Sequence, residues 1–390
     1  MILTQCAVCA TELGLSLGKK CGRCSTRYCG AECQVQHWKE GGHDTLCKKI
    51  KKAGGAEQYH ADTKYTEAVS VAVEKCAEDT KGQTCFICTQ ALHWKTKEGL
   101  VRGCACRGTA GFAHVSCLVE QAKLLFEEAK ANNWHDKRGQ ASWRRWHKCS
   151  LCEQGYHSVV SCALGWACWK TYLKYSDNEV LQQLAMSRLG CGLSDADRHA
   201  DAASIREAEL SMLRRLEGSE SSILTVQSNL ANSYQMLGRL GEALRLRRDV
   251  YSGRLKLNGD QHADTLLAVT NYASCLLSLR RFGEVKSLLR KAIPVAPRVL
   301  GESDSVTLKM RGCYAEALKS DPGATLDDVR EAVTTFEELE RTARRVFGGA
   351  HPITKGLEKC LRDARAAFHA RESDVESIRE GVEAMPPGGA

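Results

Sequence analysis

The sequence predicts two architectures in one chain: small α+β modules built around bound metal, followed by an all-α array of helical repeats. Of the 21 cysteines, 15 lie before residue 153, mostly in closely spaced pairs. From about residue 177 the apolar residues recur with the period of an α-helix, and short sequences return after 42 residues. At 390 residues the chain is also too long for one compact core.

The use of cysteine points to a reducing compartment, and we expect the cytoplasm or the nucleus. The first residues lack the basic segment and apolar stretch of a cleaved secretion signal. In a reducing compartment closely spaced cysteines are more often metal ligands than disulfides. The longest mostly apolar stretch, 159–169, is too short to cross a bilayer, so we expect no membrane association.

The formal net charge of +8 suggests a basic protein only while the cysteines are counted as neutral. Fourteen ligating thiolates and four zinc ions would lower that charge to about +2. Nucleic acid is therefore not an expected partner, because such binding needs a localised basic face. The one dense basic run, Lys48, Lys49, Lys51 and Lys52, is either an anion or nuclear-import patch or part of a solvated linker.

The first cysteine block predicts two zinc sites. A tetrahedral zinc site takes four nitrogen or sulfur ligands, and this block offers eight in four pairs. So short a segment cannot build a sufficient apolar core, whereas a structural zinc site supplies on the order of 10 kcal/mol. The eight residues are Cys6, Cys9, Cys21, Cys24, Cys29, Cys33, His43 and Cys47.

Residues 1–52 resemble the MYND finger, through Tyr28-Cys29, Cys33-Gln34, Trp38 and the final His43-x3-Cys47. The resemblance implies interleaved sites, with closed coordination shells and a role in docking short peptides. Gly41-Gly42 lengthen the usual gap before the histidine, so His37 remains an alternative ligand. The implied sites are Cys6, Cys9, Cys29 and Cys33 for one zinc, and Cys21, Cys24, His43 and Cys47 for the other.

A second cysteine block follows a predicted linker, 53–79. Its order of four cysteines, one histidine and three cysteines is shared by PHD fingers and RING-CH fingers. The spacing Cys104-x-Cys106 and the seven residues before His114 favour RING-CH, so residues 80–157 resemble that family. The long gap before Cys149 predicts an inserted helix within 118–130. The ligand candidates are Cys85, Cys88, Cys104, Cys106, His114, Cys117, Cys149 and Cys152.

The RING-CH resemblance implies zinc sites at Cys85, Cys88, His114 and Cys117 and at Cys104, Cys106, Cys149 and Cys152, which makes four zinc ions in the chain. A RING domain positions a ubiquitin-conjugating enzyme for transfer and carries no catalytic residue of its own. Ile87 occupies the position of a common aliphatic contact to that enzyme, although it could instead pack beneath the zinc knuckle. Glu153 stands where many active RING domains carry a basic residue, which argues against ligase activity.

A connecting helix is predicted at 158–176 and helical repeats at 177–370. Asn229-Leu230-Ala231, Asn271-Tyr272-Ala273 and Cys313-Tyr314-Ala315 recur at the 42-residue interval. These repeats resemble tetratricopeptide repeats of the kinesin-light-chain kind, which implies a solenoid with a peptide-binding groove. Asn229 and Asn271 would line the groove or only tie helix to helix. A short last helix is expected from His351, then a polar tail, 371–390, disordered at its end.

These modules support two main hypotheses. In the first, the chain is a ubiquitin-protein ligase or ligase subunit whose RING-CH block recruits the conjugating enzyme, while the MYND finger and repeats choose the substrate. In the second, it is a non-catalytic scaffold for protein-protein interaction. Chromatin reading through a PHD-like finger is a third reading, which the Cys-x-Cys spacing disfavours. No small-molecule active site is expected, because no phosphate- or dinucleotide-binding motif is present.

Overall fold

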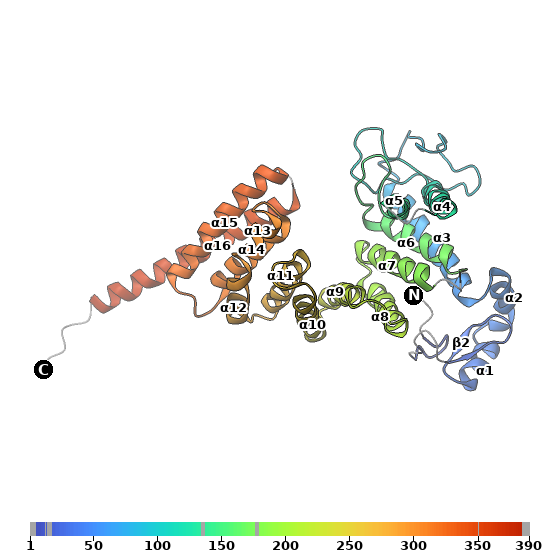
Figure 1. Ribbon diagram of the computed structural model, residues 1–390, viewed down its shortest axis with the longest axis horizontal. Coiled ribbons are helices and arrows are strands. Elements are labelled where there is room, and N and C mark those ends of the chain that lie inside the picture. Colours follow the sequence, from blue (N-terminus) through green and yellow to red (C-terminus); the bar gives the residue numbers. More distant parts are fainter. Residues whose placement is uncertain are drawn as a thin grey trace. The chain divides into compact units, whose positions relative to one another are not determined.

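The computed structural model describes residues 5–11, 13, 18–133, 137–175, 179–349 and 351–383 (Figure 1). The chain divides into two compact units, Met1–Leu237 and Gly238–Ala390. None of the described helices combines the length and the apolar composition that crossing a membrane requires.

The described elements are almost all helices. β1 and β2 pair antiparallel, with Lys19 opposite Tyr28, and they are the only named strands in the described residues. The second cysteine block contributes two isolated bridges, Val101 with Ala113 and Lys148 with Gly155. The first unit contains β1 (Lys19–Lys20), β2 (Arg27–Tyr28), α1 (Ala31–Lys39), α2 (His43–Ala53), α3 (Ala56–Cys76), α4 (Val115–Ala131), α5 (Lys137–Arg144), α6 (Ser158–Tyr172), α7 (Glu179–Asp195), α8 (His199–Arg215) and α9 (Glu220–Met236).

Helix α6 is the centre of the first unit, in the segment where we expected a connecting helix. All its residues from Val160 to Trp169 are buried, and it packs against α3, α4 and α7 (Figure 1). One continuous apolar core joins α3, the second cysteine block and α6 to α8. The second cysteine block is therefore not a structurally separate domain, because it shares its apolar core with the first predicted repeat.

The segment expected to be a linker, 53–79, contains α3. Its buried Ala61, Ala68 and Ala72 recur at helical spacing, and α3 packs against α6. Small side chains let two helix backbones approach closely, so a stretch that looks featureless in sequence forms a tight helix contact. An ion pair between Lys170 and Asp62, 3.0 Å apart, lies beside this contact.

Helices α6 and α7 meet at two glycines. A Cβ added to Gly192 would lie 2.4 Å from the carbonyl oxygen of Ser161, and one added to Gly165 would lie 3.0 Å from Cα of Leu189. Neither position has room for a side chain without separating the two helices.

The second unit consists of helices that pack in sequence-adjacent pairs. Its apolar clusters include Leu266 and Leu276 of α11, Leu289 of α12, and Phe336 and Leu339 of α15. The elements are α10 (Leu240–Asn258), α11 (Ala263–Ser278), α12 (Phe282–Ala292), α13 (Ala296–Leu300), α14 (Ser305–Ser320), α15 (Leu326–Phe347) and α16 (Pro352–Glu383).

Three of the repeats share one structural feature just before the first helix. Gly259, Gly301 and Gly348 adopt positive φ angles of 78°, 101° and 84°. Three residues later a side chain accepts a hydrogen bond from the first turn of the next helix. These side chains are His262 before α11, Asp304 before α14 and His351 before α16.

The last helix differs from our expectation. We predicted a short helix from His351 and a polar tail from residue 371, whereas α16 runs for 32 residues to Glu383. No proline interrupts the chain between Pro352 and Pro386, and Ala, Arg and Glu favour helix. The end of this predicted tail, from residue 384 to 390, lies outside the described residues.

The contact between α6 and α7 generates a stability prediction. We expect Gly192→Ala to destabilise the first unit by about 2 kcal/mol, because the added methyl group would overlap a backbone carbonyl. Hydrogen exchange of α6 and α7 amides measures the effect. Gly241→Ala in α10 is the control, since its Cβ would meet no atom within 4 Å. Equal protection of α6 in Gly192→Ala and wild type would contradict the prediction.

Candidate functional site

The structure gathers the sixteen predicted ligand residues into four clusters of four. Within each cluster the sulfur or imidazole nitrogen atoms all lie within 4.8 Å of one another. The groupings are those that the two finger resemblances implied. They are Cys6, Cys9, Cys29 and Cys33; Cys21, Cys24, His43 and Cys47; Cys85, Cys88, His114 and Cys117; and Cys104, Cys106, Cys149 and Cys152.

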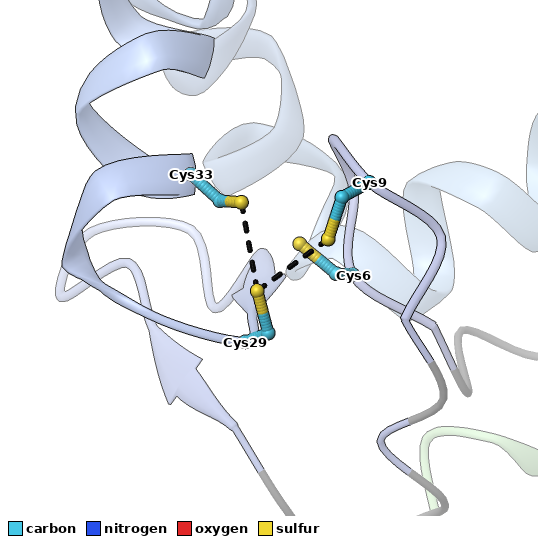
Figure 2. Close-up of side chains that lie close together, drawn as sticks. All are labelled: Cys6, Cys9, Cys29 and Cys33. Atoms are coloured by element: carbon cyan, nitrogen blue, oxygen red, sulfur yellow. Dashed lines mark hydrogen bonds between the residues drawn. The ribbon is translucent and has the colours of Figure 1, made fainter.

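The first cluster joins three segments of the MYND-like block (Figure 2). Cys6 and Cys9 come from the N-terminal turn, Cys29 follows β2, and Cys33 lies in the first turn of α1. The sulfur of Cys29 is 3.5 Å from that of Cys9 and 3.5 Å from that of Cys33. The four sulfur atoms point toward a common centre, as a tetrahedral ion requires.

The second cluster contains one of the two candidate histidines, His43. His43 is buried at the start of α2, and its Nε2 lies 3.4 Å from the sulfur of Cys24. His37 lies outside the cluster, with its Nδ1 3.0 Å from the hydroxyl of Tyr28. Gly42 takes a positive φ of 70° just before α2, and there the chain accommodates the two-residue insertion.

The third cluster has the additional contact that metal-binding histidines usually make. Nδ1 of His114 lies 3.3 Å from the sulfur of Cys88 and 3.6 Å from that of Cys117. Its other nitrogen, Nε2, lies 3.4 Å from the carbonyl oxygen of Ala91. Such a carbonyl accepts the second ring N–H and fixes the tautomer that leaves Nδ1 available to a metal.

The four Cys-x2-Cys pairs share one backbone turn. The residue after the second cysteine has a positive φ and donates its N–H to the carbonyl of the first cysteine, over 2.8 to 3.1 Å. In the second block the amides of Ile87 and Leu151 also point to the sulfurs of Cys85 and Cys149, both at 3.4 Å. Amide donors of this kind stabilise thiolate. The residues with positive φ are Ala10, Ser25, Thr89 and Glu153.

The electrostatics of the clusters favour a bound cation. The neighbouring thiol of Cys29 raises the pKa of Cys33 to about 12, and burial with Cys24 and Cys21 raises that of Cys47 to about 11. The hydroxyl and amide of Thr11 lower the pKa of Cys9 to about 6. One thiolate is thus stabilised while a second negative charge is opposed, until a divalent ion supplies the compensating charge. Sulfur and imidazole donors in fours suit zinc.

The basic run is helical. Lys48, Lys49, Lys51 and Lys52 are exposed on α2, immediately after the ligand candidate Cys47. They are part of the finger's last helix and not a linker.

A groove of about 410 Å³ lies beside the third cluster. Ile87 forms part of its wall and is 37% exposed, so its side chain is not fully covered beneath the knuckle. Glu153, at the fourth cluster, forms an ion pair with Arg145 at 2.7 Å. The groove is lined by Ile87, His93, Trp94, Ser116, Cys117, Glu120, Gln121, Leu124 and Leu125.

The second unit has a larger apolar groove of about 580 Å³. Its walls come from α11, α14, α15 and α16 and include Leu267, Val306, Phe336 and Leu357. Gly356 faces open space, because an added Cβ would meet no atom within 4 Å. Two cysteines, Cys313 and Cys360, also line this groove.

The two predicted asparagines have different surroundings. Oδ1 of Asn271 accepts a 3.4 Å hydrogen bond from Lys309, a residue that lines the groove of the second unit. Asn229 lies on α9 in the first unit, where its backbone carbonyl accepts a 3.0 Å bond from Arg206 of α8. This bond to Asn229 ties one helix to the next, through the backbone and not through the asparagine side chain.

Comparison with known proteins identifies two of the modules. Residues 6–47 match the MYND finger, and residues 222–298 match the tetratricopeptide repeat. The chain thus combines a zinc finger with tetratricopeptide repeats. These two matches leave the second cysteine block uncovered. No curated protein matches the chain.

Three solved structures are similar to part of the chain. Two crystal structures of a Podosopora anserina kinesin light chain with nearly identical TPR-like repeats share 20% identity, with TM-scores of 0.42 and 0.41. Each alignment covers 51% of this chain and 92% of the other. BtubC from P. vanneervenii shares 14% identity with a TM-score of 0.39, over 71% of this chain and 95% of its own.

The position of the histidines generates a metal-content prediction. We expect His43→Ala to lose about one zinc per chain relative to wild type, because a tetrahedral site lacks its fourth ligand. His37→Ala should retain the wild-type zinc content, and Cys191→Ser, outside the four clusters, is a further control. Elemental analysis after dialysis measures the ratio. Zinc loss in His37→Ala but not in His43→Ala would reverse the assignment.

Proposed function

We propose that this chain is a ubiquitin-protein ligase or ligase subunit. In this proposal the second cysteine block recruits a ubiquitin-conjugating enzyme, and the MYND finger and the repeats bind the substrate. The observation that carries it is the groove beside the third cluster, which Ile87 of the knuckle lines together with Leu124 and Leu125 of α4. The RING-CH-like order of ligands gives this groove its interpretation.

Zinc at the third cluster would fix the shape of the groove. Cys85 and Cys88 belong to the knuckle that carries Ile87, whereas His114 and Cys117 belong to the start of α4. One ion held by all four would therefore lock the two walls together. A ligase of this type accelerates transfer by orienting another enzyme's thioester, so a rigid docking surface is the property it needs.

All four clusters would hold zinc, one ion each, in a structural role. Each ion would have four protein ligands and no open position for a water molecule. Its chemical contribution is to bind the thiolates and cross-link the segments that carry them. The residues of this chain then dock and orient partners without making or breaking bonds.

The groove of the second unit is the proposed site for a substrate peptide. Its walls are apolar, and Lys309 and Asn271 provide polar groups at one edge. A peptide segment that places apolar side chains on these walls and a backbone carbonyl or carboxylate near Lys309 would match both the apolar walls and the polar edge. The exposed Leu267 on the groove wall gains most from such burial.

A non-catalytic scaffold is the second candidate, and one observation favours it. Glu153 follows the last ligand of the fourth cluster and is paired with Arg145. The position at which many RING domains carry a basic residue is therefore acidic and already engaged. In the scaffold the same grooves would dock partners, and ubiquitin would not be involved.

Autoubiquitination separates these two functions. Zinc-loaded full-length protein is incubated with ubiquitin, activating enzyme and a panel of conjugating enzymes. We expect wild type to form ubiquitin chains and Ile87→Ala to lose at least tenfold in rate, because Ile87 contacts the recruited enzyme. Cys85→Ser should abolish transfer by removing a zinc ligand. Val71→Ala, which truncates an exposed aliphatic residue of α3, is the matched control. If no enzyme supports transfer while zinc is retained, the scaffold function holds.

Filling the second groove tests peptide binding. Peptides are selected from a displayed random library on the full-length protein, and their Kd values are measured by fluorescence anisotropy. We expect Gly356→Leu to raise Kd at least tenfold, since a Cβ at this position meets no atom within 4 Å and the longer side chain would fill part of the groove. Gly283→Leu in α12 is the control, because its position is equally open and lies outside the groove. Equal binding to both variants would exclude this groove as the site.

A further inference from the structure

The backbone turn of the four Cys-x2-Cys pairs occurs a fifth time, at residues 93–98 of the second cysteine block, where there is no cysteine pair. His93 N–H donates to the carbonyl of Glu98 at 3.0 Å, and Lys97 N–H donates to that of His93 at 2.9 Å. Lys97 has a positive φ of 59°. The Cys85 knuckle has the same pattern at the same spacing, and there the φ of Thr89 is 61°. His93 and Thr96 thus occupy the positions of the two cysteines.

Hydrogen bonds between His93 and Thr96 hold this turn together without a metal ion. The amide of Thr96 donates to Nδ1 of His93 at 3.2 Å, and the Thr96 hydroxyl lies 2.9 Å from the same atom. The buried His93 ring packs against the ring of His114, with centroids 5.3 Å apart. The turn is therefore fixed internally and anchored to the third cluster.

This rigid turn presents a tryptophan to solvent. Trp94 is 69% exposed and lines the same groove as Ile87 and Leu124, which is itself 62% exposed. Large apolar side chains gathered at one groove mark an interaction surface. A tryptophan held in place loses little conformational freedom on binding, and such residues supply much of the affinity at protein interfaces.

The charges around Trp94 indicate the partner. Lys95 and Lys97 follow Trp94 in the same turn and are exposed, and no carboxylate in the described part of the chain pairs with either. Glu120, on the opposite wall, is paired with Lys123 at 3.1 Å. The carboxylate of Glu98 accepts bonds from the amide and hydroxyl of Ser116. The turn that carries Trp94 therefore has a net positive charge, because Lys95 and Lys97 outnumber its one carboxylate, Glu98.

We propose that this groove docks an acidic protein segment, which inserts an apolar side chain between Trp94 and Leu124 and places carboxylates beside Lys95 and Lys97. The metal-free turn is thus the part of the surface that selects the partner. This rests on the proposed function only in identifying that partner as a conjugating enzyme with an acidic docking face. The recognition chemistry itself requires no ubiquitin transfer.

The test selects peptides from a displayed random library on full-length zinc-loaded protein, with the second groove blocked by Gly356→Leu. We expect enriched peptides to carry an aromatic or long aliphatic residue flanked by Asp or Glu. Trp94→Ala should raise their Kd at least tenfold. The double variant Lys95→Glu, Lys97→Glu should do the same, and affinity should fall as salt is added.

Two controls separate recognition from folding. Leu92→Ala truncates an exposed neighbour that lies outside this groove, and Lys51→Glu with Lys52→Glu reverses two exposed charges elsewhere. Both should leave Kd within twofold of wild type. Zinc content should be unchanged in Trp94→Ala, because the side chain is exposed and binds no metal.

The outcomes distinguish this inference from ligase activity. Acidic peptides that depend on Trp94 support the docking surface, even if no conjugating enzyme forms chains. If chains form and depend on Ile87, yet Trp94→Ala transfers ubiquitin at the wild-type rate, the ligase stands and the identification of the acidic partner as a conjugating enzyme is wrong. A selection that yields no peptide, or peptides without acidic residues, overturns the inference.

Discussion

Mutual repulsion between crowded thiolates is the constraint on which the N-terminal half of this protein depends. In four groups of cysteine and histidine side chains the candidate ligand atoms lie within 4.8 Å of one another, so without a cation each group opposes the ionisation of several of its thiols at once. A divalent ion would replace this repulsion by attraction of all four ligands to one positive charge. The short strands and the turns between the cysteines provide the geometry, while a bound metal ion would provide the stabilisation that so few buried apolar residues cannot.

The second cysteine block also depends on a shared apolar core. Its ligand-bearing segments pack on α6, and α6 in turn packs on α3 and α7. The helix Ala56–Cys76 therefore joins the MYND finger to the rest of the first unit through buried contacts. A partner docked on the second block would be held by an element that also supports the first repeat helices. The second cysteine block and the first repeat helices can be told apart in the sequence, but they share one apolar core.

Sequence spacing predicted those features of the protein that depend on residues close together in the chain. The cysteine pairs and their interleaving followed from ligand spacing and family resemblance, and the repeat helices followed from periodicity. Contacts between distant segments were beyond such reasoning. The choice of His43 over His37 depends on where the chain re-enters the finger after Gly42, and the packing of α3 depends on a partner helix about 100 residues away. The length of α16 was underestimated, because its polar composition resembled a tail although it contained no helix breaker.

Trp94 illustrates a signal that sequence reasoning overlooked. The spacing His93-x2-Thr96 holds no second metal ligand, so only the backbone hydrogen bonds reveal it as a fifth knuckle. The continuous core around α6 has a further consequence, for the order of events during synthesis. The last ligand, Cys152, leaves the ribosome before α6 does, whereas the core is complete only once Met212 of α8 has emerged. At about 5–20 residues per second, zinc could bind to the four clusters of the nascent chain seconds before the apolar helix α6 is buried.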